Sequence, residues 1–88
     1  MSHSLENYAT WRPVYDADSP ARLASIGLRH VGIYQEASAP NEVIIVWEND
    51  RSAAETRGLL NQMMSDTELQ TTMKKGGVKA PPQVWIVD

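Results

Sequence analysis

The sequence predicts a single small α+β domain, and three features of the chain lead to this prediction. The 88 residues are enough for one domain, 1–88, and too few for two. Two runs rich in β-branched residues, at 28–35 and 42–48, have the composition of strands. Two segments with helical spacing and helix-capping residues follow, at 52–64 and 66–75.

The N-terminal third predicts a helix over about 7–26 that is kinked or divided into two pieces. Asn7 is a suitable N-cap. Pro13 removes a backbone donor inside the segment, and Ser19-Pro20 has the pattern of a new helix start. Aromatic side chains recur at steps of three and four on one face: Tyr8, Trp11 and Tyr15.

Two strands follow this helix and predict an antiparallel hairpin with a turn near Pro40. Alternate side chains of a strand face opposite sides of the sheet. One face of the first strand then carries Leu28, His30, Gly32 and Tyr34, and the other carries Val31 and Ile33. One face of the second strand carries Val43, Ile45 and Trp47, and the other carries Ile44 and Val46. Because both faces of the second strand are apolar, we expect both to be buried. The turn or short loop between the strands is predicted at 37–41.

Capping boxes predict the starts of the last two helices, at Ser52-Ala53-Ala54-Glu55 and at Ser65-Asp66-Thr67-Glu68. Lys74 and Lys75 lie in the final turn, where the helix dipole favours cations, and Gly76-Gly77 ends the helix. A last strand is predicted at 83–87.

The predicted order of elements is α, β, β, α, α, β, whereas a ferredoxin-like fold has the order β-α-β-β-α-β. Only residues 1–6 precede the first helix, and Leu5 is their one large aliphatic residue besides Met1. The sequence therefore predicts a ferredoxin-like antiparallel sheet with helices on one face, without the first strand. Its three main strands are 28–35, 42–49 and 83–87.

Composition bears on partners and location. The net charge is −3 and the eight Lys and Arg residues are scattered, which argues against nucleic acid and anionic membranes as partners. No apolar run approaches the roughly 18 residues of a membrane span, and the first residues lack the pattern of a signal peptide. There is no cysteine, so disulfides and thiolate metal sites are excluded. We expect a cytoplasmic protein.

The apolar hairpin predicts a homodimer. Helices of one chain cover one face of the sheet, so the other face needs a second copy to avoid a large exposed apolar patch.

Short motifs follow one another along most of the chain: Tyr8-x-x-Trp11, Tyr15-Asp16, Arg22 ahead of Gly27, Pro40-Asn41-x-Val43, Ser65-x-x-Glu68-Leu69, and Met73 through Gly77-Val78 to Pro81-Pro82. In this order they resemble small proteins of the dimeric α/β-barrel superfamily, and within it the short cyclase-like or antibiotic-biosynthesis-monooxygenase-like proteins. Tyr15 stands where these proteins usually have Phe. Members normally begin with a strand, which this chain is expected to lack.

The resemblance implies a sheet that packs against the sheet of a second subunit, with a modest cavity in each subunit. It does not imply one chemistry, because members include cofactor-free monooxygenases, polyketide cyclases and haem-degrading enzymes, besides proteins without known activity.

His30, Gly32 and Tyr34 form the candidate site that the strand pattern predicts. His30 would act as acid, base or hydrogen-bond donor, Gly32 would provide space, and Tyr34 would be a second polar group. The alternative, which we favour, is an interface histidine beside a packing glycine.

An aromatic set offers a second candidate site, a cavity between the N-terminal helix and the sheet. We expect such a cavity to touch Tyr15, His30 and Tyr34, with Trp11 or Trp47 beside them. The alternative is that the aromatic side chains, including Trp85, are core. Met63, Met64 and Met73 are read as core filler.

Two functions stay open. One is a cofactor-independent cyclase or monooxygenase that acts on a small aromatic or polyketide-like molecule, with His30, Tyr34 and Tyr15 as candidate catalytic residues. The other is a non-catalytic dimer of the same fold, which binds a small hydrophobic ligand or has a structural role. Haem degradation with His30 as axial ligand is a weaker third. We expect no cofactor, because no phosphate-binding loop occurs, and no metal, because His3 and His30 have no partner at ligand spacing.

Overall fold

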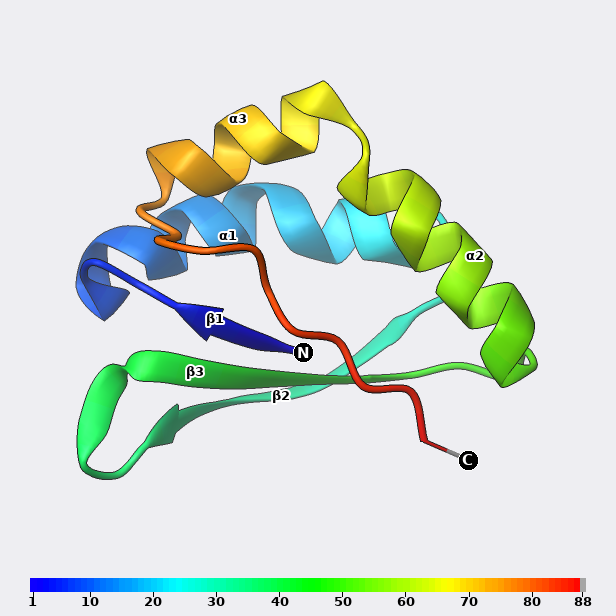
Figure 1. Ribbon diagram of the computed structural model, residues 1–88, viewed down its shortest axis with the longest axis horizontal. Coiled ribbons are helices and arrows are strands. Elements are labelled where there is room, and N and C mark those ends of the chain that lie inside the picture. The colour runs from blue at the N-terminus through cyan, green and yellow to red at the C-terminus, as the bar shows by residue number, and fades with distance from the viewer. Residues whose placement is uncertain (88) are drawn as a thin grey trace.

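The computed structural model describes residues 1–87 as three helices on one side of a three-stranded antiparallel sheet (Figure 1). In chain order the elements are β1 (Ser2–Ser4), α1 (Tyr8–Ala24), β2 (Arg29–Glu36), β3 (Ala39–Glu48), α2 (Ala53–Met64) and α3 (Thr67–Lys75). The strand order in the sheet is β1-β3-β2. The predicted α+β class is confirmed, and the arrangement is consistent with a ferredoxin-like fold that is one strand short.

The strand that is missing from the ferredoxin-like order is the last one, not the first. This corrects the expectation from the sequence. β1 pairs antiparallel with β3, with His3 opposite Val43. The C-terminal segment reaches the outer edge of β1 through a bridge between Gln83 and Ser2. Gln83 forms only this isolated bridge, and residues 84–87 belong to no strand. The predicted strand at 83–87 is therefore not formed within this chain.

Helix α1 is one uninterrupted helix, so the predicted division at Ser19-Pro20 is wrong. The Asn7 side chain caps it by accepting from the amide of Thr10 at 3.1 Å. Pro13 and Pro20 lie inside the helix and are both exposed. The buried face of α1 carries Trp11, Tyr15 and Leu23, so packing against the sheet holds the helix across both prolines.

A β-bulge at Val31 divides the predicted His30, Gly32 and Tyr34 face. His30 lies opposite Trp47, but Gly32 lies opposite Val46, so one residue of β2 has no partner. Side-chain alternation slips by one residue at such a bulge. His30 therefore shares the helix-facing side with Trp47, whereas Gly32 and Tyr34 lie on the opposite side. The prediction of one common face is wrong.

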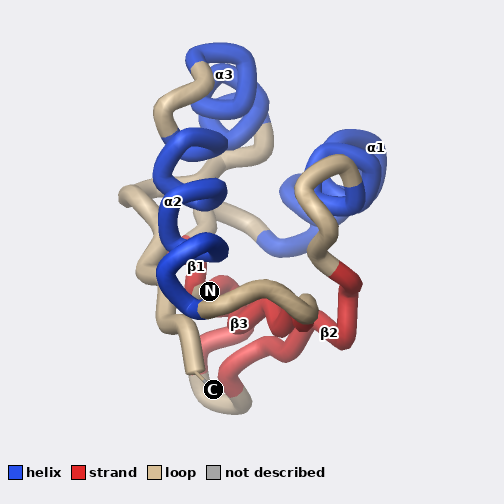
Figure 2. Tube along the Cα trace, turned by 90° about the vertical axis from the view of Figure 1, so that its right-hand side faces the viewer, coloured by secondary structure: helices blue, strands red, loops and turns tan. Residues whose placement is uncertain are grey.

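The buried core lies between the helices and one face of the sheet (Figure 2). Its largest cluster consists of Leu5, Trp11, Tyr15, Val43 and Ile45, and a second cluster consists of Leu23, Leu28 and Leu60. No helix in the described part of the chain, residues 1–87, covers the other sheet face. The apolar side chains exposed by 38–55% on β2 and β3, here called the outer face, are Val31, Tyr34, Ile44 and Val46. Within one chain, only one face of the hairpin is buried.

No helix among residues 1–87 is long and apolar enough to cross a membrane.

Candidate functional site

A small cavity of about 40 Å³, here called the chamber, lies where α1, the corner between α2 and α3, and the helix-facing side of the sheet meet. Three aromatic side chains that the sequence singled out line it: Trp11, Tyr15 and Trp47. The ring centroids of Trp11 and Tyr15 are 4.8 Å apart, and those of Tyr15 and Trp47 are 6.0 Å apart. These tilted contacts make a continuous aromatic wall. The chamber lies between α1 and the sheet, with the α2–α3 corner as a third wall.

Three buried polar atoms around the chamber have no hydrogen-bond partner among residues 1–87. They are His3 Nδ1, Tyr15 Oη and Trp47 Nε1, and all three residues line the chamber. A buried polar group without a partner costs about 1–3 kcal/mol, and such groups are rare in folded proteins. Three around one cavity mark the place where this molecule is poised to make further hydrogen bonds.

Two polar side chains of the chamber, His3 and Tyr15, are uncharged near neutral pH. Burial, with a smaller contribution from the positive N-terminal amine, lowers the pKa of His3 to about 4. Burial also raises the pKa of the Tyr15 phenol, and the nearby Asp16 carboxylate adds to this effect. An imidazole and a phenol that both remain neutral suit a neutral guest better than an ion.

All four methionines of the chain line the chamber: Met1, Met63, Met64 and Met73. Methionine side chains are unbranched and adapt their shape to what they contact. Filling the core and shaping an adaptable wall are compatible roles for these residues.

His3 is the site residue that the sequence analysis missed. Residues 1–6 form a short segment with few large aliphatic side chains, but Ser2, His3, Ser4 and Leu5 alternate between polar or small residues and larger ones. In the structure His3 and Leu5 are both buried, whereas Ser2 and Ser4 are only partly buried. The His3 ring lies 6.0 Å from that of Trp11. The period of two was the available signal.

The predicted His30, Gly32 and Tyr34 do not line the chamber. His30 is exposed and meets Trp47 edge-on, with ring centroids 4.9 Å apart. Tyr34 lies on the outer face. Trp85, the last member of the predicted aromatic set, is 59% exposed and lies outside the chamber.

Gly32 is covered by the ring of Tyr34 instead of leaving space for a ligand. A Cβ added at Gly32 would lie 2.6 Å from Tyr34 Oη and 2.8 Å from Cζ. We expect Gly32→Ala to displace the exposed ring and to change the free energy of unfolding by less than about 1 kcal/mol, because the gain from replacing a strand glycine offsets the lost contact. Urea unfolding and the NMR shifts of the Tyr34 ring measure this. A loss of several kcal/mol, or no shift of the ring, contradicts it.

Two ion-pair groups involve residues near the chamber. Arg12 pairs with Asp16 at 3.0 Å on the exposed side of α1. Arg22, which lines the chamber, pairs with Asp18 at 3.0 Å and with Asp66 at 3.2 Å. Asp16 and Arg22 do not pair with each other, because the four-residue spacing on a helix brings Asp16 to Arg12 and Asp18 to Arg22.

Among residues 1–87, no three His, Asp or Glu side chains lie together in a way that would hold a metal ion. Comparison of the chain with protein-family models, with curated proteins and with solved structures finds no match, so the geometry of the chamber carries the functional argument.

Proposed function

We propose that this chain is a homodimeric binding protein for a small, neutral, oxygen-bearing aromatic molecule, which the chamber receives. The observation that carries the proposal is the set of three unpartnered buried polar atoms, His3 Nδ1, Tyr15 Oη and Trp47 Nε1, in residues that line one cavity.

Each of these groups has a role that fits such a guest. The Tyr15 hydroxyl and the Trp47 indole N–H donate to a carbonyl or hydroxyl oxygen, and His3 Nδ1 accepts or donates according to its tautomer. The faces of Trp11 and Tyr15 provide an apolar surface for an aromatic ring. An anionic guest is disfavoured, because the Arg22 guanidinium that lines the chamber is already paired with two carboxylates.

Binding is favoured over catalysis by the protonation of the groups present. A general base works best when its pKa lies near the operating pH, whereas burial lowers the pKa of His3 to about 4. The cofactor-independent cyclase or monooxygenase that the family resemblance implies is the second candidate. Its support is His30. This residue does not line the chamber, but its ring contacts the ring of Trp47, which does.

Homodimerisation belongs to the proposal because of the outer face. Its four apolar side chains are exposed by 38–55% in the single chain, and they lie side by side on two paired strands. Contiguous apolar patches of this kind mark interfaces. A second copy that presents the same face would cover all of it in a two-fold symmetric contact.

Tyr15→Phe tests the role of the chamber, with p-cresol and toluene as a pair of probes that differ in one hydroxyl. The substitution removes a buried hydroxyl without a partner, so we expect the free protein to become more stable, by about 1 kcal/mol. The affinity for p-cresol is expected to fall by about two- to tenfold, and the affinity for toluene to stay the same. Titration followed by the NMR signal of the Trp47 indole N–H measures both affinities.

Tyr8→Phe is the matched control, because the Tyr8 hydroxyl accepts from Arg12 at 2.8 Å and does not line the chamber. It should leave both affinities unchanged. Failure of the wild-type protein to bind either probe, or a loss of stability in Tyr15→Phe, contradicts the proposal.

A further inference from the structure

The volume of the chamber is smaller than the proposed guest requires. An apolar cavity of about 150 Å³ accepts benzene, and a single water needs about 10–15 Å³. The chamber, at about 40 Å³, therefore admits water molecules but no aromatic ring until one of its walls moves.

One wall of the chamber is the α2–α3 corner, residues 63–69. It contributes Met63, Met64 and Leu69 to the lining of the chamber. The remainder of α3 continues to Gly76, which is buried and has Trp11 and Val14 as its closest neighbours. Beyond it, the amide of Glu6 donates to the carbonyl of Gly77 at 2.8 Å. The C-terminal end of α3 is thus tied to both α1 and the N-terminal segment.

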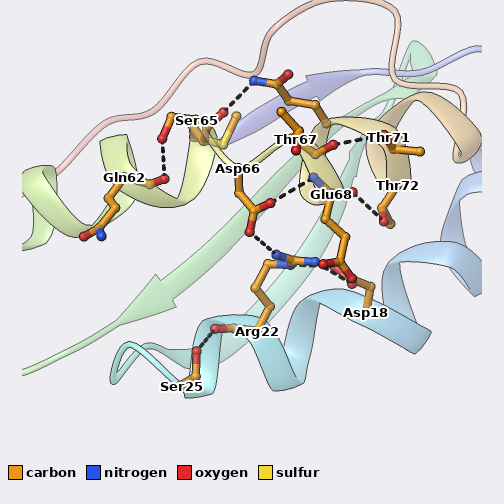
Figure 3. A network of polar contacts seen from close by, with 12 residues as sticks. Asp18, Arg22, Ser25, Gln62, Ser65, Asp66, Thr67, Glu68, Thr71 and Thr72 are labelled. Carbon is orange, nitrogen blue, oxygen red and sulfur yellow. Dashed lines mark hydrogen bonds and ion pairs between the residues drawn. The ribbon is translucent and has the colours of Figure 1, made fainter.

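Among residues 1–87, the ion pairs and hydrogen bonds between side chains of the corner and α1 come from one α1 residue, Arg22 (Figure 3). Arg22 Nη1 lies 3.2 Å from Asp66 Oδ2, while Nε and Nη2 each lie 3.0 Å from a carboxylate oxygen of Asp18. The Arg22 side chain is 18% exposed, so Asp18 holds it in a defined position. The other oxygen of Asp66 accepts from the amide of Glu68 at 2.8 Å and caps α3. The Asp66 carboxylate therefore caps the N-terminus of α3 and also forms the ion pair that links α3 to α1.

We propose that the α2–α3 corner is a lid over the chamber, latched by the Asp66–Arg22 ion pair and hinged at Gly76–Gly77. Gly77 has a φ of +80°, a conformation that glycine adopts without strain, and it lies where the pivot is needed. Opening swings the methionines away from Trp11 and Trp47 and enlarges the chamber. The purpose of the lid rests on the proposed function, but the opening itself needs no ligand.

Asp66→Asn tests the latch. Asparagine still caps the helix, whereas the ion pair with Arg22 is lost. The amides of α3 are expected to exchange hydrogen about two- to fivefold faster, the range that a partly exposed ion pair supports. Acrylamide should also quench Trp11 and Trp47 more strongly; this is measured in a Trp85→Phe background, since Trp85 is exposed. High salt should raise the α3 exchange rate and the acrylamide quenching in the unsubstituted protein. It should have little further effect on either quantity in Asp66→Asn.

Asp16→Asn is the matched control, because it removes the Arg12–Asp16 pair on the same helix but outside the chamber. Equal effects of the two substitutions, or an exchange increase that extends evenly through α1 and β3, overturn the lid. Titration with p-cresol separates the two proposals. Faster α3 exchange in Asp66→Asn without p-cresol binding to either protein leaves the lid standing and removes the binding function. Equal p-cresol binding rates with unchanged α3 exchange support the function and overturn the lid.

Discussion

His3→Gln is expected to remove a large part of the acid sensitivity of this fold between about pH 6.5 and pH 4. In the folded chain, burial lowers the pKa of His3 from 6.5 to about 4, and the N-terminal amine adds to the shift. The unfolded chain takes up a proton on this imidazole as the pH falls below 6.5, whereas the folded chain does not until about pH 4. The unfolded state therefore binds more protons in this window, and the free energy of unfolding decreases as the pH is lowered.

The lowered pKa of His3 corresponds to a decrease of up to about 3 kcal/mol in the free energy of unfolding over the whole window. The loss begins below pH 6.5 and levels off near pH 4, where the folded chain is protonated as well. Glutamine keeps polar atoms of similar size in place of the imidazole but does not titrate. Urea unfolding at several pH values measures the slope of stability against pH, which is independent of any constant effect of the substitution.

His30→Gln is the matched control for this experiment. It removes the other histidine of the chain, which is exposed and lies outside the chamber. We expect it to keep the acid dependence of the unchanged protein. The same slope in His3→Gln and in the unchanged protein would show that His3 is not held neutral by burial.

Ile44→Lys combined with Val46→Lys is expected to convert the proposed homodimer to a monomer. Both side chains lie on the outer face and are 48% and 38% exposed, so the single chain tolerates lysine at either position. In a two-fold contact each lysine occurs twice and is buried against a second copy without a counter-charge. We expect the dissociation constant to rise by at least about a hundredfold. Sedimentation velocity at micromolar concentrations measures the change.

Gln70→Lys combined with Ala54→Lys adds the same charge to exposed positions of α3 and α2, away from the outer face. This control should remain dimeric, and far-UV circular dichroism should show equal helix content in both variants. The homodimer is removed from the proposal if the unchanged protein is a monomer at micromolar concentration. It is also removed if the control variant dissociates as much as the Ile44→Lys, Val46→Lys variant.

Local sequence patterns were sufficient for α2, α3 and the hairpin. The capping box at Ser52 predicted a helix over 52–64, and α2 spans Ala53–Met64 with the Glu55 amide donating to Ser52 Oγ at 3.2 Å. The helix predicted at 66–75 is α3, Thr67–Lys75, although Asp66 and not Ser65 provides its cap. Such signals act between residues three or four apart, so they can be read without knowledge of the rest of the chain.

The site depended on contacts that no local pattern contains. The bulge at Val31, which moves His30 to a different face from Gly32 and Tyr34, is a matter of register between two strands. The latch between Arg22 and Asp66 joins residues 44 positions apart.

By itself, the sequence determined the α+β class, the hairpin, the two capped helices and the aromatic face of α1, because each depends on periodicity and neighbouring residues. Only the tertiary structure decided which end of the chain completes the sheet and which histidine is buried. β3 has one free edge, and Ser2–Ser4 pairs with it, which places His3 among the aromatic side chains of α1. Residues 84–87 form no strand. Which segments pair along a sheet edge is settled by the register of distant strands, and this physical reason lies outside any local pattern.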